Sequence, residues 1–254
     1  MPTNIETSRA FVKERTEKTR AAQATLSTDS LWNWPPKSLA QWDADIVSMD
    51  ATANGSLAKN AAAQKVNMLA ARGFVDARLD ALHKYTLMAV EVMRVRVVSP
   101  VPLPGLRPVV DDLTARGDSR RAIEEEADGL IAAWEEWEEE TNLPFIPLAG
   151  KTLPDYKLLT EGAVGSGQLT NPSLATLKKN YKTATTKWRR AEGLLNALYS
   201  RCEDECIAWY AEATAVWAAG TPEGDMIRGQ VPTDYTPTPP APPAPPAPPP
   251  PPVP

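Results

Sequence analysis

Residues 68–93 read MLAARGFVDARLDALHKYTLMAVEVM, and this stretch decides the fold class. Its apolar residues recur every three or four positions, which is the period of an amphipathic helix. The recurring set comprises Met68, Val75, Leu79, Leu82, Thr86, Ala89 and Met93, with Phe74, Tyr85, Met88 and Val92 on the adjoining stripe. We expect the helix to end before Ser99–Pro108, because repeated prolines lack the amide donors that a helix needs.

The segment before this helix has the same period, with Leu39, Trp42, Ile46 and Met49 on one stripe. Only Gly55 interrupts the two patterns, and an interior glycine costs a helix about 1 kcal/mol relative to alanine. The pattern allows either a continuous helix or a break at Gly55, and we favour one long helix with a kink there.

Helical patterns also cover both ends of the chain. Residues 5–26 are rich in Ala, Arg and Glu and predict a helix that is exposed on much of its surface. Asp118-Ser119 supplies the expected N-cap of a helix that runs through Glu140. The glycine- and proline-rich segment 142–172 predicts a loop with one or two helical turns near Asp155–Leu159. A last long helix is expected from Pro172 or Ser173 to Gly220-Thr221-Pro222.

Sustained alternation of β-formers is almost absent, so the fold class is all-α. We predict an up-and-down bundle of about four major helices, built as one domain from residues 1–230. Leu79-Asp-Ala-Leu82 and Leu195-Asn-Ala-Leu198 fall in the same phase of their ladders. This similarity raises the hypothesis that the bundle consists of two duplicated helical hairpins.

Residues 231–254 form an Ala/Pro-rich tail that cannot join a helix and is expected to be disordered or polyproline II. Its repeated P-x-x-P spacing permits docking into an aromatic groove, although no basic or aromatic residue accompanies the repeats. We therefore favour a spacer over a ligand. The prolines of the docking hypothesis are Pro239, Pro240, Pro242, Pro243, Pro245 and Pro246.

Composition excludes several classes of protein. The formal net charge is -5, which argues against a surface that is basic throughout. No apolar stretch has the length of a signal peptide or a membrane span, so we expect a cytoplasmic protein without membrane association. The two cysteines, Cys202 and Cys206, are too close in the sequence for a disulfide scaffold.

Residues that can carry catalysis are few. His83 is the single histidine, and no motif places a nucleophile beside it. The acidic run from Glu124 to Glu140 lacks the two Glu-x-x-His motifs of a di-metal bundle, so it predicts a solvated acidic face. Cys202 and Cys206 continue an apolar ladder and lack two further zinc ligands, which favours small buried side chains. The glycine-rich segment 162–167 matches neither the dinucleotide-binding spacing nor the Walker spacing of phosphate loops. We therefore expect no cofactor and no metal.

The segment 177–190 contains six basic residues with Tyr181 and Trp188 between them, and no acidic residue occurs from Ala163 to Ala191. This pattern is compatible with a nucleic-acid face, with ion pairing to the acidic Glu124–Glu140 helix, and with a plain exposed face. The charge count alone favours pairing with the acidic helix. The six residues are Lys178, Lys179, Lys182, Lys187, Arg189 and Arg190.

The C-terminal part resembles a group of uncharacterised bacterial all-helical bundle proteins that end in a Pro-rich linker. The resemblance covers residues 191–233 and rests on the runs AEGLLNAL (191–198), WYAEATA (209–215) and GTPEGDMIRGQVPT (220–233). It implies a helical bundle followed by a linker, and it brings no activity and no functional residue.

Together these patterns predict a non-enzymatic structural or protein-interaction module, a rigid bundle with a spacer or docking tail. A protein partner and self-association through a helical face are the expected modes of binding. The alternative is nucleic-acid association through residues 178–190. An enzyme that uses His83 or the pair Cys202 and Cys206 is the weakest alternative.

Overall fold

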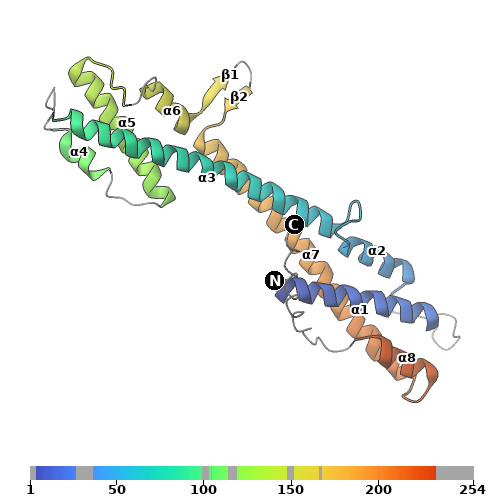
Figure 1. The fold of residues 1–254 in the computed structure, drawn as a ribbon. Coiled ribbons are helices and arrows are strands. Elements are labelled where there is room, and N and C mark those ends of the chain that lie inside the picture. Colours follow the sequence, from blue (N-terminus) through green and yellow to red (C-terminus); the bar gives the residue numbers. More distant parts are fainter. Residues whose placement is uncertain are drawn as a thin grey trace, which may run out of the picture. The chain divides into compact units, whose positions relative to one another are not determined.

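The computed structural model describes residues 4–26, 37–98, 103, 105–113, 119–147, 152–165 and 168–232. The described part is almost entirely helical, as the sequence predicts (Figure 1). Its helices are α1 (Asn4–Leu26), α2 (Leu39–Met49), α3 (Leu57–Arg96), α4 (Arg107–Asp112), α5 (Arg120–Thr141), α6 (Leu153–Glu161), α7 (Leu174–Val216) and α8 (Pro222–Gln230). A short antiparallel hairpin joins β1 (Ala163–Gly165) to β2 (Gln168–Asn171).

The chain divides into two compact units. Unit 1 comprises Met1–Lys59 and Gly193–Pro254, and unit 2 comprises Asn60–Glu192. The α7 sequence thus contributes its first part to unit 2 and its second part to unit 1. That residues 1–230 fold as one domain stays a prediction.

Unit 1 is organised around tryptophans on α2 and α7. Trp42, Trp209 and Trp217 are buried in one apolar cluster, which Leu26 of α1 and Ile227 of α8 complete. A second cluster joins Val12, Met49, Leu198 and Cys202. The helix α1 contacts both α2 and α8, so its inner face lies within the core of the unit.

The inner face of α1 is larger than the sequence predicts. Besides Val12, Ala22 and Leu26, it buries Arg15, Thr16, Thr19 and Gln23. These residues are small or polar, so hydrophobic periodicity does not reveal them. The helix α1 is therefore exposed on less of its surface than the sequence predicts.

The prediction of one long helix through Gly55 is wrong. The helix α2 ends at Met49, and the Asp50 carboxylate accepts hydrogen bonds from the backbone N–H and the hydroxyl of Thr52. Gly55 has φ +76°, a left-handed conformation that glycine adopts without steric cost. The chain therefore turns at Gly55 before α3 begins at Leu57.

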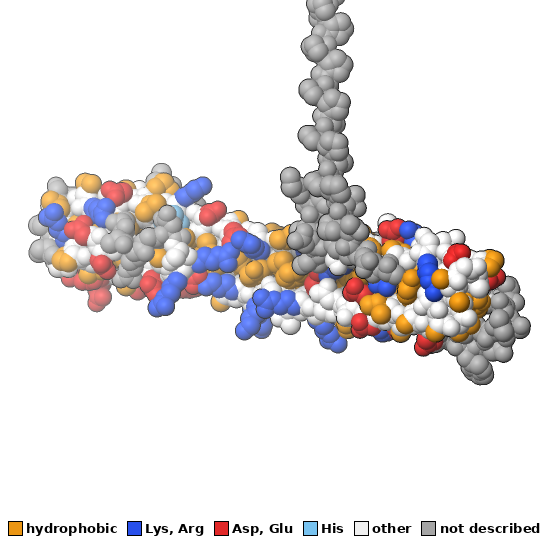
Figure 2. Space-filling view, turned by 90° about the horizontal axis from the view of Figure 1, so that it is seen from below, with side chains coloured by type: hydrophobic (Ala, Val, Ile, Leu, Met, Phe, Trp, Pro, Cys, Tyr) orange, Lys and Arg blue, Asp and Glu red, His pale blue; other side chains and the backbone are white. Residues whose placement is uncertain are grey.

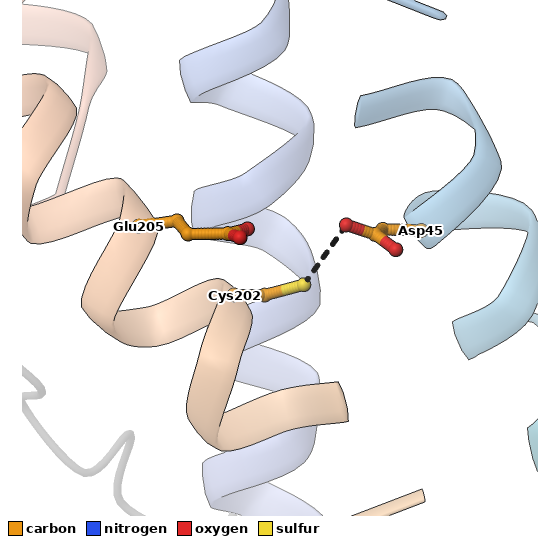
Figure 3. Close-up of side chains that lie close together, drawn as sticks. All are labelled: Asp45, Cys202 and Glu205. Atoms are coloured by element: carbon orange, nitrogen blue, oxygen red, sulfur yellow. Dashed lines mark hydrogen bonds between the residues drawn. The ribbon is translucent and has the colours of Figure 1, made fainter. Parts of the chain in front are cut away.

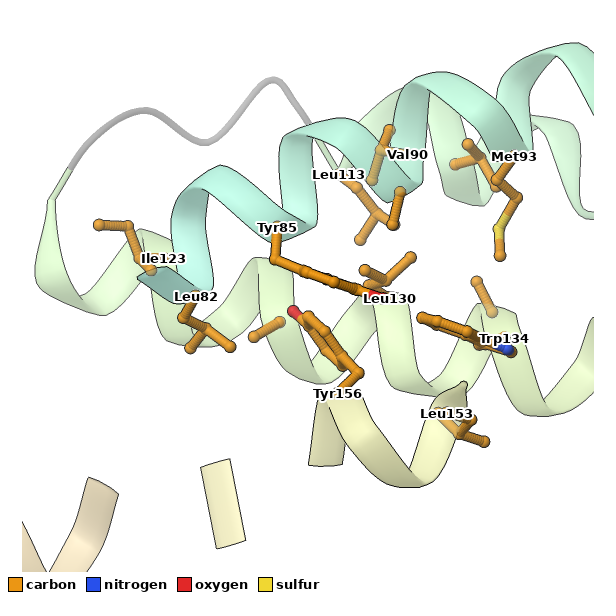
Figure 4. Close-up of a cluster of buried hydrophobic side chains, with 14 of the residues drawn as sticks. Leu82, Tyr85, Val90, Met93, Leu113, Ile123, Leu130, Trp134, Leu153 and Tyr156 are labelled. Carbon is orange, nitrogen blue, oxygen red and sulfur yellow. The ribbon is translucent and has the colours of Figure 1, made fainter. Parts of the chain in front are cut away.

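The core of unit 2 lies between α3, α5 and α6 (Figure 4). All seven residues of the recurring apolar set in α3 are buried, which confirms the predicted ladder. Trp134 of α5 packs against Phe145 and Tyr156, with ring centroids 5.0 and 5.9 Å apart. The Tyr156 hydroxyl lies 2.6 Å from the Thr86 hydroxyl, so the buried phenol has a hydrogen-bond partner.

The helix boundaries of α5, α6 and α7 agree with the sequence, and Ser119 caps α5 by accepting a hydrogen bond from the Ala122 N–H. The hairpin, α4 and α8 were not expected. Pro108 stands in the first turn of α4, where a missing amide donor costs nothing. Thr221 caps α8 in the same way that Ser119 caps α5, and Pro222 opens the helix instead of ending the fold.

Candidate functional site

A cluster of charged side chains lies in unit 1, where the start of α2 meets α7 (Figure 3). The Lys37 ammonium bridges the carboxylates of Asp45 and Glu205. Arg201 donates a 2.6 Å hydrogen bond to Asp45 Oδ1, and the Cys202 thiol lies 3.6 Å from Asp45 Oδ2. Two cations thus face two carboxylates around one buried thiol.

Local sequence positions each member of this cluster. Ser38 and Gln41 form a capping box that begins α2, and this cap fixes the place where Lys37 enters. Asp45 follows Trp42 by three residues and shares the buried face of α2. On α7, the spacing of Arg201, Cys202 and Glu205 directs the three side chains towards α2, because residues three and four apart share a helix face.

Lys37 is held by further contacts. Its ammonium lies 4.1 Å from the centre of the Trp42 ring, and its carbonyl accepts a 2.6 Å hydrogen bond from Gln23. The amide of Gln23 in turn accepts a 2.8 Å hydrogen bond from Trp42 Nε1. Burial alone lowers the pKa of Lys37, but the hydrogen bonds to Asp45 and Glu205 outweigh it, so the pKa is raised. The side chain is therefore a fixed cation.

Asp45, Cys202 and Glu205 offer three ligand atoms within 4.8 Å of one another, a spacing that fits a metal ion. Two observations oppose this use. The Lys37 ammonium already lies between the two carboxylates. Burial, together with the neighbouring Asp45, raises the pKa of Cys202 to about 12, so the thiol stays protonated at neutral pH. The cluster is best described as an ion-pair network that joins α2 to α7.

An open pocket of about 310 Å³ borders the network, and Gln41, Ala44 and Ala208 line its remaining wall. The charged groups at its base are already paired with one another. Cys206 is buried one turn beyond Cys202, and burial raises its pKa as well. Both thiols are free and buried, which confirms their interpretation as small core residues.

The other predicted residues lie in unit 2. His83 Nδ1 is 3.7 Å from a carboxylate oxygen of Glu126, which is 2% exposed. The acidic run is therefore only partly a solvated face. Glu138 is a second exception to the predicted solvated face, because its carboxylate accepts hydrogen bonds from Trp134 Nε1 and from the backbone N–H of Phe145.

The basic segment 178–190 forms an exposed face of α7, which we call the basic face. Lys178 pairs with Glu124 of the acidic helix α5, as the pairing hypothesis expects. The charged groups of the other five have no acidic partner among the described residues and face solvent. The five are Lys179, Lys182, Lys187, Arg189 and Arg190. Lys and Arg side chains also gather on the surface shown in Figure 2.

A shallow polar groove of about 170 Å³ adjoins the basic face. Lys187 contributes its charge to the groove, and the polar side chains of Gln64, Asn67, Asn180 and Thr183 line it. The groove therefore combines hydrogen-bonding groups with positive charge, which is the chemistry that a phosphate backbone requires.

An apolar stripe runs along the solvent side of α3, which we call the α3 outer face. Val66, Phe74 and Val95 are 65%, 65% and 69% exposed. At 100° per residue, the members lie on one side of the helix, opposite the buried ladder. Its exposed apolar and small residues are Val66, Leu69, Ala70, Gly73, Phe74, Ala77, Ala81, Leu87, Met88, Val95 and, just after the helix, Val98, and the exposed charged residues Asp80, Lys84 and Glu91 lie on the same side.

No protein-family model, curated protein or solved structure matches this chain. Within the described residues, no helix is both long and apolar enough to cross a membrane. The predicted docking prolines, Pro239 to Pro246, lie outside the described residues.

Proposed function

We propose that the protein is a non-enzymatic, cytoplasmic bacterial module that binds other proteins through a helical surface. The α3 outer face carries this proposal. Large apolar side chains gathered on one exposed helix face are typical of a surface that binds another protein. Single exposed apolar residues, by contrast, are common on any protein surface. The enzyme alternative has little support, because both thiols are buried and protonated and the network around Lys37 is paired within itself.

The long helices are proposed to form an up-and-down bundle of about four major helices, built from two duplicated hairpins. In support, Leu79 and Leu82 of α3 are buried, and so are Leu195 and Leu198 of α7. The Pro-rich tail would serve as a spacer beyond the bundle or as a docking peptide.

The test compares proteins captured by the full chain with those captured by Phe74→Glu. We expect the variant to lose partners, because a charge replaces the 65% exposed aromatic ring of the α3 outer face. Val47→Glu is the matched control, since Val47 is 52% exposed but lies on α2. Equal capture by all three chains would remove the α3 outer face from the proposal. A chain ending at Pro232, which keeps the buried Val231, tests the tail in the same assay.

A second candidate function is nucleic-acid association through the basic face. In the described part of the chain, five exposed cations of the basic face have no acidic partner. This finding supports nucleic-acid association more strongly than the number of basic residues in the sequence does. If each contacts one phosphate, log K should fall with log salt with a slope of about -4.5 or shallower. A mobility-shift titration with duplex and single-stranded DNA measures this slope.

Lys187→Glu combined with Arg190→Glu should weaken DNA binding and make that slope shallower by about 2. The control is Arg121→Glu, since Arg121 is exposed but pairs with Glu125 on α5. Absence of binding at low salt would eliminate this candidate.

A further inference from the structure

The α3 outer face contains two charges at its middle. Asp80 and Lys84 are both exposed, and the structure shows no ion pair or hydrogen bond of either charged group with another described residue. Their spacing of four residues normally allows an ion pair within one helix. Nearby charges behave differently, because Arg72 pairs with Asp76 and Glu91 pairs with Arg94. Within the described residues, an aspartate and a lysine thus stand unpaired in an exposed apolar stripe.

We propose that a second copy of this chain covers the α3 outer face, with the two α3 helices antiparallel about a two-fold axis at the level of Leu82. The proposal rests on the proposed function and names its partner. Around such an axis, Asp80 of each copy lies level with Lys84 of the other. The two charges therefore form two reciprocal ion pairs, as an isologous interface requires.

Three pairs of exposed apolar residues follow the same symmetry. Residues whose numbers add up to 164 lie at the same level in this arrangement. Val66 is then level with Val98, Leu69 with Val95, and Ala77 with Leu87, and each of these six residues is exposed in the single chain. Ala77 and Ala81 lie next to the axis, where small side chains allow two helices to approach closely. A parallel pair would instead place Asp80 against Asp80.

The size of the surface predicts a weak dimer. Residues 66–98 span about 50 Å at 1.5 Å per residue, and a helix is about 10 Å wide. Each copy would therefore bury roughly 500 Å², and the pair roughly 1,000 Å², at the lower limit for a specific interface. We expect a dissociation constant in the micromolar range.

Charge reversal tests the proposed pairs. Sedimentation of the full chain from about 1 to 100 μM in low salt should show a monomer–dimer equilibrium. Asp80→Lys and Lys84→Asp should each weaken it by about 10- to 30-fold, because both pairs become repulsive. The double variant Asp80→Lys with Lys84→Asp should restore it. A chain that stays monomeric at 100 μM, or a double variant without rescue, would overturn the proposal.

Cysteine cross-linking tests the register. The side chains at position 81 of the two copies would be displaced by only about 3 Å along the helices, so Ala81→Cys should give a disulfide-linked dimer under mild oxidation. Ala63→Cys is the control, because Ala63 lies five turns earlier on the same side of α3 and is also exposed. Its copies would be about 57 Å apart. Cross-linking of both variants would indicate parallel pairing and refute the two-fold axis at Leu82.

The two proposals fail in different ways. If the chain is monomeric but Phe74→Glu still loses captured proteins, the α3 outer face binds a different protein and self-association is wrong. If Phe74→Glu changes neither capture nor sedimentation, the proposed function fails as well. Circular dichroism of each variant shows whether the helices persist.

Discussion

At the scale of single residues, the network around Lys37 shows how charge becomes part of a core. Asp45 occupies a position in phase with Trp42 and Met49, where an apolar side chain is expected. Lys37 and Arg201 compensate its charge, so burial does not leave it isolated. Such a network stabilises the fold while all its partners are present. Loss of one partner leaves a buried charge uncompensated, which destabilises the folded state.

Lys37→Met should therefore destabilise the protein. The substitution leaves Asp45 with Arg201 alone and removes the bridge to Glu205, and we expect a loss of about 2–3 kcal/mol. Urea unfolding at neutral pH measures it. Lys187→Met changes the same residue type on the basic face and should alter the free energy of unfolding by less than about 0.5 kcal/mol. Similar losses in both variants would contradict the role of the network.

The Cys202 thiol predicts a pH dependence. Its pKa is raised to about 12 in the folded chain, whereas an unfolded thiol ionises at about pH 8.5. The unfolded state therefore releases its proton first as pH rises. This contribution to stability is fully present below about pH 8.5 and is lost between there and pH 12, by up to about 1.4 kcal/mol per pH unit.

Cys202→Ala should flatten the fall in the free energy of unfolding between pH 9 and 10.5. Tyr85, whose pKa burial raises to about 12, remains in both chains and gives the common background. An unchanged slope would show that the thiol does not contribute.

At the scale of elements, regular apolar spacing is sufficient to predict α3, α5 and α7, because α3 and α5 each bury a ladder and α7 buries one at each end, around residues 178–190. Apolar spacing does not predict the elements whose boundaries depend on backbone conformation or on hydrogen bonds. The break at Gly55 depends on a positive φ and on hydrogen bonds to Asp50, and neither alters hydrophobic periodicity. The hairpin after α6 and the short helix α4 are too brief to show a period.

The candidate site was missed for a related reason. Charged residues are normally interpreted as solvated, so Asp45 and Glu205 carried no signal of burial. Their helical positions do indicate burial, because Asp45 lies on the same face of α2 as Trp42. Glu205 likewise lies between the two buried cysteines, Cys202 and Cys206, in the α7 sequence. The six basic residues are evident in the sequence, but the favoured prediction that they pair with the acidic helix holds only for Lys178 among them.

Two glycines should respond oppositely to alanine. Gly55→Ala forces a side chain into a left-handed conformation and should cost about 1 kcal/mol, although the site has open space around it. Gly193 lies in the interior of α7, also with open space, and Gly193→Ala should stabilise by about 0.5–1 kcal/mol. Thermal unfolding compares the two, and changes of the same sign would contradict the turn at Gly55.

At the scale of the whole molecule, charge and apolar surface are distributed unevenly. The chain has a net charge of -5, yet the basic face gathers five cations that have no acidic partner in the described part of the chain, and the α3 outer face concentrates exposed apolar side chains. Average composition therefore conceals two surfaces of different chemistry. Both belong to unit 2, whereas the charged network of unit 1 is paired within itself.

The position where the folded part ends is the last consequence at this scale. Sequence places the end of the last long helix at Gly220–Pro222, but α8 follows and buries Ile227 and Val231 in the core of unit 1. A chain ending at Gly220 should lose about 3–6 kcal/mol, because each of these two side chains contributes about 1.5–3 kcal/mol when buried. A chain ending at Pro232 retains both residues and should match the full chain. Urea unfolding of the three chains tests this, and equal stability would mean that α8 packs without contributing to the core.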